Sequence, residues 1–160
     1  MTKPEFIAAA TAAAHVSSAA SGFPPGVTVA QAALESAWGQ SQLARLANNY
    51  FGIKAHGDLP WIELPTIEVQ DGAAVKVRAY FARYPSTEAC FEDRDRLIAR
   101  LAVYAEARAA VTHPEAFIRA LAKHWATDPH YAEKLLAVYR EHGFDKLDQA
   151  FSTQQSALSQ

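Results

Sequence analysis

Apolar residues along this chain recur at intervals that predict helices over most of its length. From Ala30 to Trp38 they repeat at the helical spacing, which places them along one buried stripe. Thr28 is suited to cap the start of this helix. Gly39 is suited to end it, because glycine adopts a left-handed backbone without steric cost. A single acid, Glu35, then lies in the last turn.

The spacing changes to an alternation of period two between His56 and Tyr84. Two alternating runs flank Asp71 and Gly72, a dipeptide that favours a tight turn, so this region predicts one antiparallel hairpin. Helical spacing returns after Ser86, which we expect to cap the next helix. The predicted fold is α+β and mainly helical, with a helical lobe and one small hairpin lobe.

The length and composition of the chain narrow its possible domain organisation and partners. The chain has 160 residues, which suits a single domain with its own core, predicted over residues 1–148. Residues 149–160 are polar, and we expect a disordered tail there. The net charge of -2 argues against nucleic acid as a partner. No segment approaches the roughly 20 apolar residues of a membrane span, so we expect no insertion into a membrane. We also expect the chain to be a monomer.

Several chemistries find no support in the sequence. The single Cys90 excludes an intrachain disulfide, and we expect a buried apolar side chain there. The histidines are not spaced as zinc ligands on one helix, and we expect no metal and no other cofactor. Residues 92–96 mix acids and bases, which is typical of a solvated helix face. The alanine-rich N-terminus carries Glu5 and His15, unlike a secretion signal, so we expect a chain that is made without a signal or has lost it.

Glu35 has a position from which it can act as an acid. The C-terminal end of a helix carries partial negative charge, which raises the pKa of a carboxyl group there. Trp38 lies three residues on, and we expect its ring to cover this carboxyl and raise the pKa further by desolvation. A carboxyl that keeps its proton near neutral pH can protonate a leaving oxygen. The alternative is an ordinary solvated helix glutamate.

Two stretches between residues 30 and 54, AQAALESAWGQS and NNYFGIK, carry a family resemblance. They resemble the catalytic-glutamate segment of glycoside hydrolase family seventy-three, the bacterial endo-β-N-acetylglucosaminidases related to the peptidoglycan-cleaving half of the flagellar rod assembly protein. The resemblance implies a lysozyme-like fold with a cleft between the two lobes, and it implies that Glu35 is the essential acid. Tyr50 stands where the family usually has leucine. Asn49 either hydrogen-bonds a sugar or, with Asn48, ends the short helix before it.

The same resemblance implies a second carboxylate, in a T-x-E segment of the hairpin. Glu68, two residues after Thr66, matches this position. Glu63 is a rival, and on an unbroken strand the two glutamates would face opposite sides. We expect Pro65 to break the strand, which weakens that distinction. A solvent-facing strand glutamate is the alternative for either residue.

A second motif, HWATDPHYAEKL at residues 124–135, is similar to the family's G-Y-A-T-D-P-x-Y-A-x-K-L. The resemblance implies that its aromatic residues line the cleft and stack on or orient sugar rings. Tyr131 matches the second tyrosine, whereas Trp125 replaces the first and lacks its hydroxyl, and His124 replaces the glycine. Asp128 alternatively caps a helix that starts at Pro129. The expected substrate-binding residues are Trp38, Asn49, Phe51, Trp125, Asp128 and Tyr131.

The resemblance implies hydrolysis of the β-1,4 bond after N-acetylglucosamine in peptidoglycan, with the glycan strand as partner and the cell wall as the site of action. Glu35 would be the general acid. Glu68 would activate water, stabilise positive charge at the anomeric carbon, or orient the substrate's acetamido group, and the sequence leaves these open. The alternatives are an N-acetylmuramidase, a lytic transglycosylase, or a wall-binding or assembly module without turnover.

Overall fold

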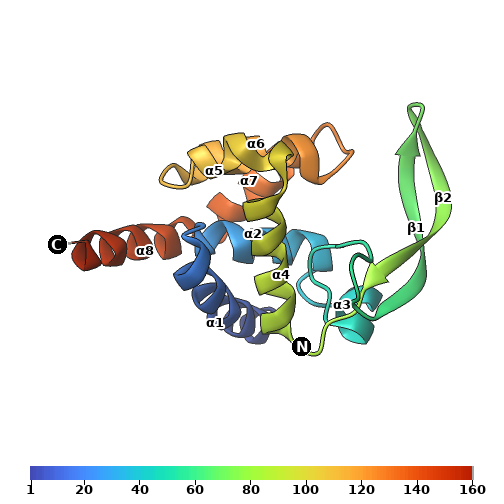
Figure 1. The fold of residues 1–160 in the computed structure, drawn as a ribbon, viewed down its shortest axis with the longest axis horizontal. Coiled ribbons are helices and arrows are strands. Elements are labelled where there is room, and N and C mark those ends of the chain that lie inside the picture. The colour runs from blue at the N-terminus through green and yellow to red at the C-terminus, as the bar shows by residue number, and fades with distance from the viewer. Residues whose placement is uncertain (160) are drawn as a thin grey trace.

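The computed structural model describes residues 1–159 as a helical body with a β-hairpin that stands away from it (Figure 1). The hairpin comprises β1 (Trp61–Gln70) and β2 (Ala73–Ala82), which confirms the predicted α+β, mainly helical class. Within the described residues, no helix combines the length and hydropathy that crossing a bilayer requires. The helical segments are α1 (Lys3–Ser21), α2 (Pro25–Ser36), α3 (Gln42–Ala47), α4 (Thr87–Arg100), the short 3-10 segment η1 (Ala102–Tyr104), α5 (Ala105–Ala109), α6 (Pro114–Trp125), α7 (Tyr131–Glu141) and α8 (Asp145–Leu158).

Helix α2 forms the centre of the body, and α1, α7 and α8 pack against it. Every residue from Pro25 to Ala33 is buried, so this helix is enclosed on all sides instead of along one stripe. Our prediction that Thr28 caps its start was wrong. Thr28 lies inside the helix, where its hydroxyl donates to the Pro24 carbonyl at 3.2 Å. The helix starts earlier because proline is well suited to the first helical position.

The chain leaves α2 through three consecutive left-handed residues. The φ angles are 50° at Ala37, 58° at Trp38 and 80° at Gly39, so the helix ends before the glycine that we expected to end it. The Ser36 hydroxyl holds this turn, donating to the Ala32 carbonyl at 2.5 Å and accepting the Gly39 amide at 2.9 Å. Glu35 nevertheless lies in the last turn of the helix, as predicted.

The hairpin pairs β1 and β2 over their whole length, with Glu68 opposite Val75. Our expectation that Pro65 breaks the strand was wrong, because β1 continues through it. Each strand of a two-stranded sheet has a free edge, where proline's missing N–H removes no ladder hydrogen bond. Burial alternates along both strands. The inner face is half-buried or buried and carries Ile62, Leu64, Val75, Val77, Ala79 and Phe81, while the outer face exposes Trp61, Ile67, Val69 and Tyr80.

Helix α4 buries charges that we expected to be solvated. Asp93, Arg94 and Asp95 are all buried, and Arg94 is 0% exposed. Arg94 lies four residues after Cys90 and four before Ile98, both buried, so it falls on the stripe that faces the body. Cys90 is a free, buried thiol as predicted, and burial raises its pKa to about 12.

Helix α8 covers most of the segment that we expected to be a disordered tail. Its first turn is tied to the body by the buried Asp148. One carboxylate oxygen of Asp148 accepts the Gly26 amide at 2.6 Å, and the other accepts the Tyr139 hydroxyl at 2.7 Å. Asp148 therefore caps the N-terminus of α2 from α8, a helix that is distant in sequence but packed against it. This helix corrects our expectation of a disordered tail. The composition could not reveal it, because a tertiary contact of this kind leaves no trace in the local sequence.

Candidate active site

Glu35 is half-buried at the C-terminal end of α2. Burial raises the pKa of its carboxyl group, and a hydrogen bond from the Tyr131 hydroxyl partly opposes this rise, because it stabilises the ionised form. The raised pKa agrees with the sequence prediction. A carboxyl group in this state can hold a proton at a pH where a solvated glutamate has lost it, which is the property a general acid needs.

Trp38 does not cover Glu35 as we expected. Its indole ring packs against Phe6 of α1 at a centroid distance of 5.9 Å, and against His142 and Phe144 of the α7–α8 turn at 4.6 and 6.3 Å. The left-handed turn at Ala37 and Trp38 breaks the helical interval, so the ring no longer lies one turn above the acid. These contacts make Trp38 a packing residue at the end of α2.

Tyr131 is the motif residue that the structure brings to the acid. It is buried at the start of α7, and its hydroxyl accepts a hydrogen bond from Nε2 of Gln31 at 3.1 Å. Oε1 of Gln31 in turn accepts one from Nε of Arg94 at 3.0 Å. The sequence analysis missed Gln31 and Arg94. Gln31 lies one helical turn before Glu35, a spacing that would have placed both on one side of α2.

The loop after α3 closes over the acid. Gly52 adopts a left-handed backbone with φ of 69°, and a Cβ atom there would lie 3.9 Å from Oε2 of Glu35. Asn49 holds the loop: its Nδ2 donates to the Ile53 and Ala82 carbonyls at 2.9 Å each, and its Oδ1 accepts the amides of Phe51 and Ile53. The close approach of backbone to carboxylate depends on these bonds.

Asn49 and Phe51 are not placed where we expected them to meet a sugar. Each is 1% exposed. The Asn49 amide is fully used by the loop, and the Phe51 ring packs on Phe91 at 4.9 Å and beneath Arg94. Both side chains therefore pack beneath the loop and hold it in place. Asn48 ends α3 in a left-handed conformation, the second of the two roles considered for this pair.

The two hairpin glutamates lie on opposite faces. Glu68 belongs to the inner face, where its carboxylate pairs with Nζ of Lys54 at 2.5 Å. Glu63 belongs to the outer face and pairs with Arg78. Lys54 lies two residues after Gly52, so one short loop segment passes beside Glu35 at Gly52 and pairs with Glu68 through Lys54.

An open hollow of about 370 Å³ borders this loop. Trp125 lines it together with Tyr104 of η1, and the Trp125 ring also meets the edge of Phe51 at a centroid distance of 6.4 Å. Half-buried Trp125 thus presents an aromatic surface on the helical side. The lining residues are Gly52, Ile53, Lys54, Ala55, His56, Leu97, Arg100, Leu101, Tyr104 and Trp125.

Asp128 lies in the turn between α6 and α7. Its carboxylate accepts the His130 amide at 2.8 Å and pairs with Nζ of Lys134 at 2.5 Å. Together these two bonds lower the pKa of the carboxyl. The helix that follows begins at Tyr131, two residues later than the Pro129 start considered from the sequence. Asp128 therefore organises the turn that delivers Tyr131 to Glu35.

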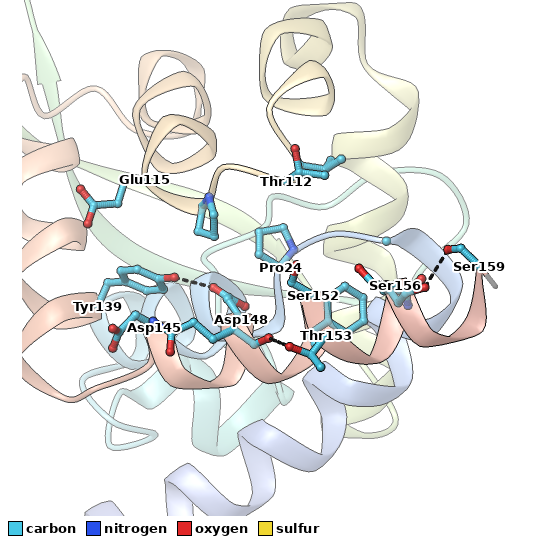
Figure 2. Close-up of a pocket in the computed structure, with 16 residues that line it drawn as sticks. Pro24, Thr112, Glu115, Tyr139, Asp145, Asp148, Ser152, Thr153, Ser156 and Ser159 are labelled. Carbon is cyan, nitrogen blue, oxygen red and sulfur yellow. Dashed lines mark hydrogen bonds between the residues drawn. The ribbon is translucent and has the colours of Figure 1, made fainter.

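A larger hollow, of about 810 Å³, lies between α8 and the segment before α6 (Figure 2). It borders Asp148 and thus the N-terminus of α2, whereas Glu35 lies nine residues along that helix, about 14 Å away at 1.5 Å per residue. Two of its three acids are engaged, since Asp148 bonds Tyr139 and Gly26, and Glu115 pairs with Arg140; the third, Asp145, is half-buried at the start of α8. This hollow therefore lies at the other end of α2 from Glu35.

Residues 11–144 match the family model described as glucosaminidase, mannosyl-glycoprotein endo-beta-N-acetylglucosaminidase. The chain is 34% identical over 130 residues to the exo-glucosaminidase LytG of Bacillus subtilis, which covers 78% of this chain and 46% of that protein. It is 36% identical over 143 residues to the peptidoglycan hydrolase FlgJ of Salmonella typhimurium, covering 86% and 45% respectively. The chain thus spans about half the length of these curated relatives.

The fold is shared with a solved structure as well. A peptidoglycan hydrolase mutant from Sphingomonas sp. A1 matches it with a TM-score of 0.78 and 32% sequence identity, covering 89% of this chain and 96% of that one. This confirms the predicted lysozyme-like arrangement of a helical lobe and a hairpin lobe. The chain belongs to the glucosaminidase family, glycoside hydrolase family seventy-three.

Proposed function

We propose that this chain is a peptidoglycan hydrolase that cuts the β-1,4 glycosidic bond after N-acetylglucosamine. The observation that carries the proposal is the position of Glu35: its half-buried carboxyl lies in the last turn of α2, beside the loop at Gly52 and next to Tyr131, and burial raises its pKa. Family membership and the relatives' names, exo-glucosaminidase and peptidoglycan hydrolase, supply the substrate class.

In the proposed reaction Glu35 is the general acid. It donates its proton to the glycosidic oxygen as the bond to the anomeric carbon breaks, and it becomes a carboxylate. The leaving sugar departs as a neutral alcohol. The anomeric carbon develops positive charge and takes up the oxygen of water, whose proton is released. The Tyr131 hydroxyl stabilises the Glu35 carboxylate that forms.

Glu68 is the proposed second carboxylate, in preference to Glu63. It lies on the inner face of the hairpin and is paired with Lys54 from the loop that passes beside Glu35. An ionised carboxylate there can attract the proton of an incoming water or stabilise the positively charged anomeric centre. Glu63 is directed to the outer face by the same strand, which supports Glu68.

The glycan strand is proposed to run through the hollow between the loop and the helical lobe. Trp125 offers an aromatic face on which a sugar ring can stack, and Arg100 in the same wall can pair with carboxylates of the peptide-substituted sugars. Asp128 would then act through the turn that holds Tyr131. The proposed site of action is the cell wall, with the chain acting as a monomer and without insertion into the membrane.

Digestion of purified peptidoglycan tests the proposal. Fragments are reduced with borohydride and identified by mass spectrometry for the wild type and for Glu35→Gln, Glu68→Gln and Glu63→Gln. We expect reduced N-acetylglucosamine ends from the wild type, none from Glu35→Gln, a strong loss for Glu68→Gln, and wild-type amounts for Glu63→Gln. Circular dichroism and binding to insoluble peptidoglycan show that each variant is folded and still meets its substrate.

Other outcomes would replace this assignment. Reduced N-acetylmuramic acid ends would indicate an N-acetylmuramidase, and anhydro ends would indicate a lytic transglycosylase, which needs one acid and no water. Binding without any product from the wild type would indicate a wall-binding module. Equal losses for Glu68→Gln and Glu63→Gln would contradict the assignment of the second carboxylate.

A further inference from the structure

The acid lies beside one end of a short chain of buried hydrogen bonds that joins Tyr131, Gln31 and Arg94. Glu35 and Gln31 come from α2, Tyr131 from α7 and Arg94 from α4. Tyr131 contacts both Glu35 and Gln31, and Gln31 contacts Arg94. Gln31 and Arg94 are each 0% exposed, so water does not compete for these bonds.

The direction of every bond in this chain follows from Arg94. A guanidinium group has donors and no acceptor, so the Gln31 atom 3.0 Å from Nε of Arg94 must be the amide oxygen. The amide nitrogen of Gln31 then faces Tyr131, at 3.1 Å, and donates to the phenolic oxygen. With its oxygen accepting from Gln31, Tyr131 has its own hydrogen free to donate to Glu35.

Arg94 is held so that it cannot turn away from Gln31. Its Nη1 donates to Oγ1 of Thr28 at 2.9 Å and to Oδ1 of Asp95 at 2.8 Å. Asp95 in turn accepts the Ser21 hydroxyl at 2.7 Å, which fixes the carboxylate from α1. The Arg94 guanidinium also lies over the Phe51 ring, at 5.5 Å from its centroid. The buried cation therefore has a single orientation.

We propose that Arg94 and Gln31 are positioning residues, which set the Tyr131 hydroxyl as a hydrogen-bond donor to Glu35 and thereby keep the acid's own proton free for the leaving oxygen. Without Gln31, the phenolic oxygen could accept a hydrogen bond from protonated Glu35 and withhold that proton from the substrate. This inference rests on the proposed role of Glu35 as general acid, and it adds the residues that orient it.

The electrostatic surroundings of the relay agree with this arrangement. Burial and the neighbouring Glu35 both raise the pKa of Tyr131, so the phenol keeps its hydrogen, while Gln31 and Arg94 act in the opposite direction. Arg94 is the cation among the groups that face the relay. The titratable and charged groups packed around it are Glu35 on α2, Cys90, Asp93 and Asp95 on α4, Tyr104 on η1 and Tyr131 on α7.

The pH dependence of kcat/KM in four proteins tests the proposal: the wild type, Gln31→Met, Tyr131→Phe and the double variant. Tyr131→Phe removes the donor to ionised Glu35, and Gln31→Met lets the Tyr131 oxygen accept from protonated Glu35, so in each variant the basic limb of the profile should move to higher pH by about one unit. Because both act through one hydrogen bond, the double variant should show no further shift. An unmoved limb in Gln31→Met, or additive shifts in the double variant, would overturn the proposal.

Two further variants separate positioning from folding. Tyr139→Phe removes a buried hydrogen bond to Asp148 that has no part in the relay, and it should lower Tm with the basic limb unmoved. Gln31→Glu keeps an acceptor for Arg94 but cannot donate to Tyr131, so it should move the limb upward even if Gln31→Met folds poorly. Carboxyl ¹³C NMR of Glu35 follows the same shift without turnover, which distinguishes failure of the relay from failure of the hydrolase assignment.

Discussion

The approach of Gly52 to Glu35 leads to a paired prediction with an internal control. Gly52 has φ of 69° and Gly57 has φ of 58°, so alanine at either position must adopt a left-handed backbone. That conformation costs an L-residue about 1–2 kcal/mol, and the smaller entropy of the unfolded alanine chain returns about 0.4–1 kcal/mol. We therefore expect each variant to lose about 1 kcal/mol of unfolding free energy, or about 2–4 °C in Tm.

The two variants differ in what the new methyl group meets. At Gly52 it lies 3.9 Å from Oε2 of Glu35, whereas at Gly57 nothing lies within 4 Å. On the proposed mechanism, the methyl at Gly52 occupies space beside the carboxyl that the sugar or water would enter. Displacing a reacting group by about 1 Å costs about 100-fold in rate, so we expect kcat/KM of Gly52→Ala to fall by about 10- to 100-fold. Gly57→Ala should keep wild-type activity.

The assay is initial-rate turbidity loss of a peptidoglycan suspension, with Tm measured by circular dichroism on the same preparations. The reasoning predicts equal Tm losses with unequal activities. It would be refuted if Gly52→Ala kept wild-type kcat/KM despite its lower Tm, or if Gly57→Ala lost activity to the same extent.

Two further predictions concern stability. Burial raises the pKa of Asp148 from its ordinary value of 3.8 to about 6 in the folded chain, so the folded state binds this proton more tightly. Relative to Asp148→Asn, the unfolding free energy of the wild type should therefore fall by about 2 kcal/mol as pH rises from about 4 to about 6. Urea titrations of both proteins at several pH values measure this, and a difference that stays constant with pH would contradict it. Asn49→Ala removes four hydrogen bonds from the loop over the acid and should cost about 2–4 kcal/mol together with most of the activity, so a variant that keeps activity at normal Tm would show that the loop holds without them.

The elements of the fold and the place of Glu35 in the last turn of its helix were predictable because their signals are local. The spacing of apolar residues gave the helices and the hairpin, and the motif around Glu35 placed it in the last turn of α2. The second motif matched Tyr131, which the structure brings to the same carboxyl group. Strand alternation also separated Glu68 from Glu63, once β1 proved continuous through Pro65.

The features that escaped prediction depend on partners distant in sequence. Arg94 stands in a charged run typical of a solvated face, and only contacts with Gln31 and Thr28 reveal it as buried. Trp38 has the right spacing to cover Glu35, but a left-handed turn moves it away. Asn49 was expected at a sugar, whereas its amide is used by backbone groups from two segments. Residues 149–158 were expected to be disordered, but they continue a helix whose first turn is anchored to α2 by the bond between Asp148 and Gly26.

The central claim is that Glu35 holds a proton which it gives to the leaving oxygen. The most direct measurement is a ¹³C NMR titration of the Glu35 carboxyl carbon, assigned by the loss of its signal in Glu35→Gln, beside the pH profile of kcat/KM. We predict that the pKa of Glu35 lies above that of a solvated glutamate and coincides with the basic limb of the profile. A Glu35 that titrates at or below that value, or a basic limb that does not follow it, would contradict the account.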